Sequence, residues 1–410
     1  MDKINKENKS KISRRKFFYL GGAGIILPAL FNKNSIMSNT PSASDFTDIK
    51  ITAVEPWILK AGSLFILVRT NAGITGIGEC SPMNIRVNAG MIENALASRI
   101  IGKNPLDINI LWESMYFGTY KLGTMGSQPE SIAGIDIALW DILGKVVNLP
   151  LYKLLGGRRR EKIRMYSSIG NGSRRTVDEM VRLAVDSVEK GFTALKIRMD
   201  WGNNRTDVNP EHDWKIISQV RKTVGDNIEL GFDANNGFSV STAIGMGKRM
   251  YEELGIIHYE EPIAQYDYEG IAQVVEAVDV PVAAGEHEYT RWQFRDLINI
   301  AKVDILQPDL VKCAGITEAV KIAALASAHN KILVPHQTQP TIGNAVNLHF
   351  TSCFAKTEVA QEFNKSDKKT GTLNRVFKNP LVFDNGYFSV PEGPGIGLEL
   401  DENELKKIRI

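Results

Sequence analysis

The chain has 410 residues, of which 43% are hydrophobic and 23% charged, and its formal net charge at pH 7 is +2. This length is enough for one large domain and a smaller one, and the composition is that of a globular enzyme rather than a disordered or fibrous protein. The near-neutral charge gives no support for nucleic acid or an acidic membrane surface as the main partner. The three cysteines, Cys80, Cys313 and Cys353, lie far apart without metal-type spacing, so we predict free, buried thiols.

The first 44 residues have the plan of an export signal. A basic lead reaches Arg14 and Arg15, and a short apolar segment broken by glycines follows over 17–31. That segment is short for a membrane-spanning helix, whereas paired arginines before it are typical of twin-arginine signals. We therefore predict a signal and linker over 1–44, a periplasmic protein, and a membrane tether only if the signal is retained. The alternative is a flexible basic tail with a chance arginine pair.

Residues 45–163 have the pattern of a small α+β unit. The runs at 48–59 and 63–79 are β-type, and "TNAGITG" (70–76) inside the second is a hairpin signal with Asn and Gly at the turn. Apolar residues then recur with helical spacing over 91–102 and 131–157, and the second segment closes with Gly-Gly.

Residues 164–375 alternate between short apolar strands and amphipathic helical segments. The predicted strands are 163–169, 193–199, 228–234, 256–262, 280–286, 303–309, 331–336 and 357–363. Eight such units favour a parallel β/α barrel, and an open doubly wound sheet is the alternative. No Gly-rich dinucleotide loop follows the first strand. We expect the segment 376–410, which returns to hairpin-like alternation, to pack back on the N-terminal unit.

Ionisable residues follow the later predicted strands at matching positions. They are Asp233, Glu260, Glu286, Asp309, His336 and Glu362, separated by 27, 26, 23, 27 and 26 residues. Each step is about one strand–helix unit, so these side chains are predicted to form a ring at the C-terminal mouth of the barrel, where barrel enzymes place their catalytic groups.

The first three of these acids predict a metal site. Asp233, Glu260 and Glu286 would repel one another unless a cation lay between them. Carboxylate oxygens alone suit a hard ion that keeps positions open for water or substrate, so Mg²⁺ is the expected ion. For any one of these acids, a helix N-cap or a solvated loop position is the plainer interpretation.

The other ring members predict an acid–base pair and two cations beside it. Asp309 and His336 come from adjacent strands, and a carboxylate on one imidazole nitrogen leaves the other as a general base. Lys196 and Arg198 lie two apart on a strand and therefore share a face. We expect His287 to point to the side opposite Glu286. The remaining histidines are interpreted as structural or surface residues: His212, His258, His329 and His349.

These motifs together resemble the mandelate racemase subgroup of the enolase superfamily. The likeness rests on Lys-x-Arg, "DAN", "EEP", "GEH", "QPD" and "VPH", with the segment 131–157 and "PGIGLEL". It implies an N-terminal α+β capping domain over a (β/α)7β TIM-like barrel, an essential Mg²⁺, and removal of the proton α to a substrate carboxylate. It assigns the metal to Asp233, Glu260 and Glu286, the acid–base pair to Asp309 and His336, and a hydrogen bond with the substrate carboxylate to Glu362. Lys196 would hold the carboxylate end.

One position separates this chain from the usual pattern of that family. The second strand usually carries Lys-x-Lys, whose second lysine is a base, and Arg198 occupies that place. Arginine stays protonated and is a poor base, so His336 is the one credible base, and a single base suits β-elimination.

We predict an acid-sugar dehydratase, most like galactonate and rhamnonate dehydratases, that forms a 2-keto-3-deoxy acid. A racemase, epimerase or cycloisomerase is the alternative, and a non-catalytic binding protein is the third. Capping loops at 61–64 and 120–128 are expected to set specificity, and the family likeness implies a homo-oligomer.

Overall fold

The computed structural model describes residues 48–202, 206–356, 358–364 and 367–410, so the predicted signal over 1–44 lies outside the described residues. The described residues all belong to one compact unit. Among the helices that are described, none has the length and apolar character needed to cross a membrane. Cys80, Cys313 and Cys353 are buried and free, which confirms the interpretation of the cysteines.

The N-terminal part is an antiparallel sheet covered by helices. The strands β1 (Ile51–Leu59), β2 (Ser63–Thr70) and β3 (Thr75–Cys80) pair in that order, and the turn predicted at 70–76 joins β2 to β3. The helical elements are α1 (Ile85–Met91), η3 (Ile92–Leu96), α2 (Ala97–Ile100), α3 (Ile108–Thr119), η4 (Tyr120–Leu122), α4 (Ser127–Val147) and α5 (Leu151–Leu154). This is the predicted α+β unit.

Glycines allow α4 to lie directly on β3. A Cβ atom at Gly78 would come within 1.9 Å of the carbonyl oxygen of Gly134, and one at Gly76 within 2.1 Å of that of Ala138. Any side chain on β3 at these points would push the helix away, because buried backbone atoms have no room to move. The close approach buries the apolar face of α4 against β2 and β3.

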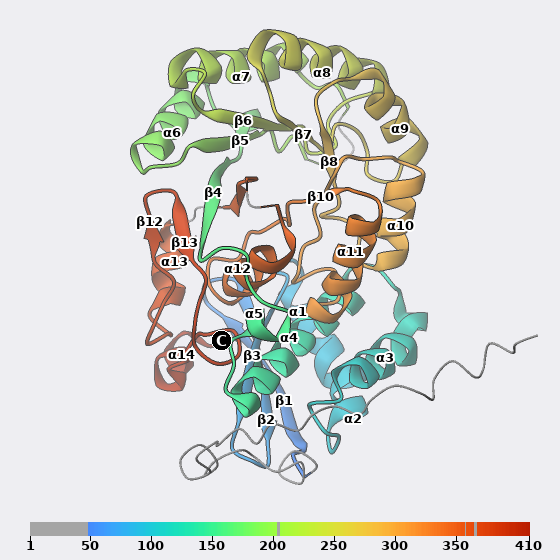
Figure 1. Ribbon diagram of the computed structural model, residues 1–410, viewed down its shortest axis with the longest axis vertical. Coiled ribbons are helices and arrows are strands. Elements are labelled where there is room, and N and C mark those ends of the chain that lie inside the picture. The colour runs from blue at the N-terminus through green and yellow to red at the C-terminus, as the bar shows by residue number, and fades with distance from the viewer. Residues whose placement is uncertain (1–47, 203–205, 357, 365–366) are drawn as a thin grey trace, which may run out of the picture. The chain divides into compact units, whose positions relative to one another are not determined.

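The larger part is built from parallel strands with helices outside them (Figure 1). The strands are β4 (Lys162–Ile169), β5 (Ala194–Arg198), β6 (Glu229–Asp233), β7 (His258–Glu260), β8 (Val282–Ala284), β9 (Ile305–Leu306), β10 (Ile332–Leu333) and β11 (Gln361–Phe363). The intervening helical elements are η5 (Gly172–Arg174), α6 (Val177–Glu189), α7 (Pro210–Val224), α8 (Val240–Leu254), α9 (Tyr268–Ala277), α10 (Arg291–Asn299), α11 (Ile316–Ala328) and α12 (Ile342–Phe354).

The order of these strands identifies a barrel rather than an open sheet. Strands β4 to β10 are hydrogen-bonded to one another in sequence order, and β11, the last, pairs with β4, the first. A doubly wound sheet instead reverses its strand order part-way. Strands β10 and β11 are the remaining neighbours. The backbone N–H of Gln337, after β10, donates to Oε2 of Glu362 on β11 at 3.1 Å and so links these two strands. The predicted TIM-like barrel with an α+β cap is confirmed.

The chain after β11 contacts both parts. It first forms α13 (Asp367–Asn374), and the segment 376–410 then contains β12 (Phe383–Asp384), β13 (Tyr387–Ser389) and α14 (Glu402–Ile408). The β12–β13 hairpin pairs with β4 in antiparallel fashion. Further on, the carbonyl of Gly395 accepts from the N–H of Leu151 at 2.7 Å, and the N–H of Ile410 donates to the carbonyl of Ile58 on β1 at 2.9 Å.

Candidate active site

The predicted ring residues lie at the C-terminal ends of the barrel strands. Strand register pairs Arg198 with Asp233 and Asp233 with Glu260, so these three residues lie at one level across β5, β6 and β7. Beyond the strand ends, Glu286 and His336 follow β8 and β10. The side chains therefore form two groups, one inside the barrel and one on the wall of a cavity.

The inner group consists of Lys196, Asp233, Glu260 and Glu362, all of them buried. Nζ of Lys196 donates to both carboxylate oxygens of Glu260, at 2.7 and 2.8 Å. The same atom lies 2.9 Å from Oε1 of Glu362 and 3.7 Å from Oδ2 of Asp233. One buried ammonium group thus contacts three carboxylates.

The pKa values of this group follow from that contact. Burial would raise the pKa of Glu260, but Lys196 and the hydrogen bond from His258 outweigh it and hold the pKa well below its ordinary value. Asp233 lacks so close a cation. Its burial, together with repulsion from Glu260 and Glu286, raises its pKa well above the ordinary value. Burial lowers the pKa of Lys196, but Glu260 and Glu362 more than offset this, so the ammonium stays charged.

Asp309 and His336 are hydrogen-bonded to each other. Nδ1 of His336 lies 2.7 Å from Oδ2 of Asp309, and Oδ1 of Asp309 accepts the N–H of Val311 at 2.9 Å. Nε2 of His336 lies 3.0 Å from Oε2 of Glu286. Burial lowers the pKa of the imidazole, but Glu286 outweighs that effect and the pKa is raised overall. The carboxylate of Asp309 fixes one ring nitrogen, so the other is directed at Glu286.

Lys312 is a buried cation that sequence reasoning did not single out. Its Nζ lies 3.5 Å from Oε1 of Glu286 and 3.9 Å from Oδ2 of Asp309. It comes three residues after Asp309, on the turn that follows β9. Its place only three residues after the candidate acid–base residue Asp309 was the feature of the sequence that could have identified Lys312.

Arg198 does not belong to the inner group, and its guanidinium lies near the end of β4, the first strand of the barrel. Its Nη2 lies 3.8 Å from Oδ2 of Asp200. A Cβ atom at Gly170 would come within 2.3 Å of Nη2 of Arg198, so a side chain at this position would displace the guanidinium. Lys196 and Arg198 share a strand face as expected, but they contact different partners.

A cavity of about 280 Å³ lies over this mouth. The barrel residues on its wall include Arg198, Asn236, Glu261, Glu286, His287, Lys312 and His336, and the cap contributes Pro82 and Met83. Hence the cap residues on the cavity in this structure differ from those expected at 61–64 and 120–128. A larger cavity of about 410 Å³, lined by residues such as Thr75 and Asn379, lies away from the acid–base pair.

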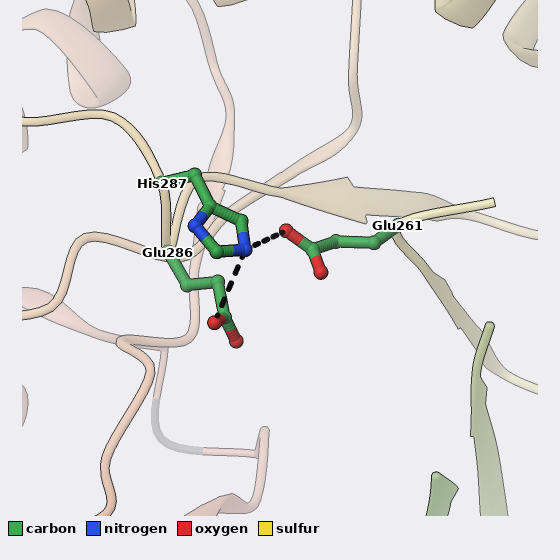
Figure 2. A group of neighbouring side chains, drawn as sticks. All are labelled: Glu261, Glu286 and His287. Carbon is green, nitrogen blue, oxygen red and sulfur yellow. Dashed lines mark ion pairs between the residues drawn. The ribbon is translucent and has the colours of Figure 1, made fainter. Parts of the chain in front are cut away.

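His287 lies on the same side as Glu286, which corrects the expectation that it points the opposite way. Nε2 of His287 lies 3.5 Å from Oε1 of Glu286 and 3.4 Å from Oε1 of Glu261 (Figure 2). Strand β8 ends at Ala284, so the alternation of side chains along a strand no longer applies at these two residues.

Glu260 has two further partners that sequence reasoning missed. Nε2 of His258 lies 2.9 Å from its Oε2, and Nε2 of Gln307 donates to the same oxygen at 2.6 Å. His258 is buried and lies two residues before Glu260 on β7. That spacing places both on one strand face and was a usable signal.

The predicted Mg²⁺ ligands fit a hard divalent ion by their chemistry. Asp233, Glu260 and Glu286 are carboxylates from successive strands; Glu260 and Glu286 both act to raise the pKa of Asp233, and Glu260 also acts to raise that of Glu286. Such mutual repulsion is what a shared cation relieves. The donor set is oxygen only, which Mg²⁺ prefers.

Family comparisons cover almost all of the described chain. Residues 51–156 match the N-terminal domain of mandelate racemase / muconate lactonizing enzyme, and residues 179–404 match the enolase C-terminal domain-like family.

An arabinonate dehydratase of Saccharolobus solfataricus is 32% identical over 83% of this chain and 89% of its own. A D-galactarolactone cycloisomerase of Agrobacterium fabrum is 33% identical over 85% and 91%. A mandelate racemase/muconate lactonizing protein of Paracoccus denitrificans, solved with magnesium, has a TM-score of 0.83 and 37% identity, covering 88% of this chain and 98% of that one. This chain therefore belongs to the mandelate racemase/muconate lactonizing enzyme family of the enolase superfamily.

Proposed function

We propose that this enzyme is a Mg²⁺-dependent acid-sugar dehydratase. It removes the proton α to a substrate carboxylate and expels the 3-hydroxyl as water, which gives a 2-keto-3-deoxy acid. The observation that carries the proposal is the hydrogen-bonded Asp309–His336 pair on the cavity wall, with arginine at the position where the family usually has a second base. An arabinonate dehydratase at 32% identity agrees with this reaction class.

His336 would act first as base and then as acid. Asp309 holds Nδ1, which leaves Nε2 to take the α-proton and then to return it to the departing hydroxyl group. A single residue that performs both transfers removes the need for a base on the other face of the substrate. Asp309 also favours the protonated imidazole between the two transfers.

Positive charge on the cavity wall would receive the anionic substrate. Arg198 and Lys312 line the cavity, and both are charged groups able to donate hydrogen bonds to a carboxylate or a hydroxyl. Lys196 is fully engaged with the inner carboxylates, so we assign it the support of that group rather than the first contact with substrate.

Mg²⁺ would be held by Asp233, Glu260 and Glu286. Once bound, it supplies Lewis-acid stabilisation of the negative charge that develops when the α-proton leaves. Glu362 on β11 accepts a hydrogen bond from the N–H of Gln337 and lies 2.9 Å from Nζ of Lys196, so it connects the last strand of the barrel to the inner group.

A library of aldonic and uronic acids tests the proposal. Purified protein with Mg²⁺ should form 2-keto-3-deoxy acids, detected as semicarbazones, and the His336→Asn variant should form none. Absence of any turnover across such a library, with Mg²⁺ binding demonstrated, would contradict the proposal.

Cycloisomerisation is the second candidate, since a relative at 33% identity is a D-galactarolactone cycloisomerase. Lactone or anhydro-sugar acid substrates in D₂O distinguish the two. Deuterium incorporation at the α-carbon without loss of water would favour an isomerase, whereas a keto acid that lacks the 3-hydroxyl would favour the dehydratase.

The location of the protein is a separate proposal. We infer export through the twin-arginine pair Arg14 and Arg15, on sequence grounds alone. Fractionation of cells that express the full chain should place it in the periplasm, and replacement of both arginines by lysine should retain it in the cytoplasm.

A further inference from the structure

We propose that Glu261, Glu286 and His287 form a second divalent-cation site, for an ion that accepts an imidazole ligand, such as Zn²⁺. This site overlaps the proposed Mg²⁺ site at one residue, Glu286, and its other two ligands are not among the proposed Mg²⁺ ligands. It depends on side-chain geometry and not on which reaction the enzyme catalyses.

The three side chains present their donor atoms to one another. One ligand atom from each lies within 4.8 Å of the others, and Nε2 of His287 is 3.4 Å from Glu261 and 3.5 Å from Glu286. Figure 2 shows Nε2 of the imidazole directed at both carboxylates. Ligands at about 2.0–2.2 Å from a zinc ion lie roughly 3–4 Å apart. Small rotations of these side chains would therefore complete the set.

Glu261 provides an independent indication of a ligand. Its side chain is only 3% exposed, and within the part of the chain that the structure describes its Oε1 has no hydrogen-bond partner. Its other oxygen is held by Nδ2 of Asn236 at 2.9 Å. Buried carboxylate oxygens without a donor are costly. Here the bare oxygen is the one that faces His287.

The chemistry of this set differs from that of the Mg²⁺ ligands. An imidazole with two carboxylates suits Zn²⁺ or Mn²⁺, whereas Asp233, Glu260 and Glu286 offer oxygen only. All three residues of the second set line the cavity, so solvent or substrate can complete the coordination. Lys312, 3.5 Å from Oε1 of Glu286, is the charge with which a bound ion would compete.

Because Glu286 belongs to both ligand sets, each replacement is expected to have its own effect on metal binding. Replacement of Glu286 should weaken both sites, because its carboxylate belongs to both sets. Replacement of His287 or Glu261 should weaken only the imidazole-containing site, and replacement of Asp233 only the oxygen-only site.

The test is Zn²⁺ binding by calorimetry to the purified, chelator-stripped full chain, with neither Mg²⁺ nor substrate present, so that no second ion competes for Glu286. The variants are His287→Ala, His287→Gln, Glu261→Gln and Asp233→Asn. His329→Ala, an exposed histidine after α11, is the matched control. Circular dichroism and the thermal midpoint of each variant verify folding.

We expect the His287 and Glu261 variants to lose Zn²⁺ affinity by at least about tenfold, the smallest loss usual even for a supporting residue of a metal site. Asp233→Asn and His329→Ala should keep the affinity of the wild type. Unchanged binding in folded His287→Gln and Glu261→Gln variants would overturn the proposal. So would Zn²⁺ binding that disappears only in Asp233→Asn. Because no turnover is measured, failure of the dehydratase proposal would leave this result unaffected.

Discussion

The two groups at the barrel mouth both combine a lysine with carboxylates, but only the outer group contains histidine and lines the cavity. The inner group, Lys196 with Asp233, Glu260 and Glu362, is at most 1% exposed and pairs its charges internally. The outer group, Glu261, Glu286, His287, Lys312 and His336, lines the cavity, and the side chain of His287 is 30% exposed. The inner group is a closed ionic network, whereas the outer group still has polar atoms directed at the cavity.

This difference separates two effects of a mutation. Loss of a partner from a buried ionic network leaves uncompensated charge and destabilises the fold. Groups of the outer set border the cavity and contact one another across it, so their loss is expected to affect chemistry more than stability. The predictions below test this separation.

The largest expected effect on activity is that of His336→Asn. Loss of a general acid–base residue lowers kcat by about 10²–10⁴-fold. Asparagine can still donate a hydrogen bond to Asp309, so the free energy of unfolding should change less than on loss of Lys196. Steady-state kinetics with urea unfolding measures both. As a control, His329→Ala should leave kcat unchanged, and a His336→Asn variant with full kcat would remove this residue from the mechanism.

Lys196→Met should affect stability first, and activity only through the loss of stability. Removal of a buried ammonium group from three carboxylates is expected to cost about 3–5 kcal/mol in the free energy of unfolding, with activity lost as a consequence. Chemical denaturation measures the first and turnover the second.

The matched control for Lys196 is Lys190→Met on the surface, whose pair with Asp186 is exposed. We expect a change of less than about 1 kcal/mol there. Equal stability losses in the two variants would show that the inner group has no special role.

The outer group was also the part least accessible to sequence reasoning. Periodicity predicted the strands, the barrel and the N-terminal α+β unit, because each strand carries its own apolar pattern and each acid follows its strand at a regular step. Glu261, Lys312 and the direction of His287 depend on loops after the strands, where backbone angles and not alternation set direction. Glu261, for example, has a φ of 42°. Which partner a side chain contacts, such as Glu260 for Lys196, depends on packing between residues far apart in the sequence, and no local pattern encodes it.

Arg198→Met should have an intermediate effect, on substrate binding more than on chemistry. A charge-assisted hydrogen bond contributes about 1.5–3 kcal/mol, so KM should rise roughly 10–100-fold with a smaller change in kcat. Full activity with unchanged KM would exclude contact between Arg198 and substrate. A companion variant, Arg198→Lys, restores the usual family pattern, and α-proton exchange in D₂O would then report a second base.

The smallest effect on activity is expected from Asp136→Asn, which concerns a buried acid outside both groups. Asp136 on α4 accepts hydrogen bonds from the backbone N–H and Oγ1 of Thr317 on α11, at 2.9 and 2.6 Å. Burial, only partly opposed by these bonds, raises its pKa from 3.8 to about 7. Between these values the folded state binds more protons than the unfolded state. The contribution of Asp136 to stability therefore falls as pH rises, by at most about 1.4 kcal/mol per pH unit.

The asparagine variant stays neutral, so its stability should decline less than that of the wild type between pH 4 and pH 7, at unchanged kcat. Urea unfolding at several pH values measures the difference. Parallel profiles for the two proteins would show that Asp136 is ionised in the folded state. In that case burial alone would not be enough to protonate an acid that has a lysine nearby, as Asp136 has Lys321. Repulsion by Glu260 and Glu286 would then be needed to explain the raised pKa of Asp233, which lies near Lys196.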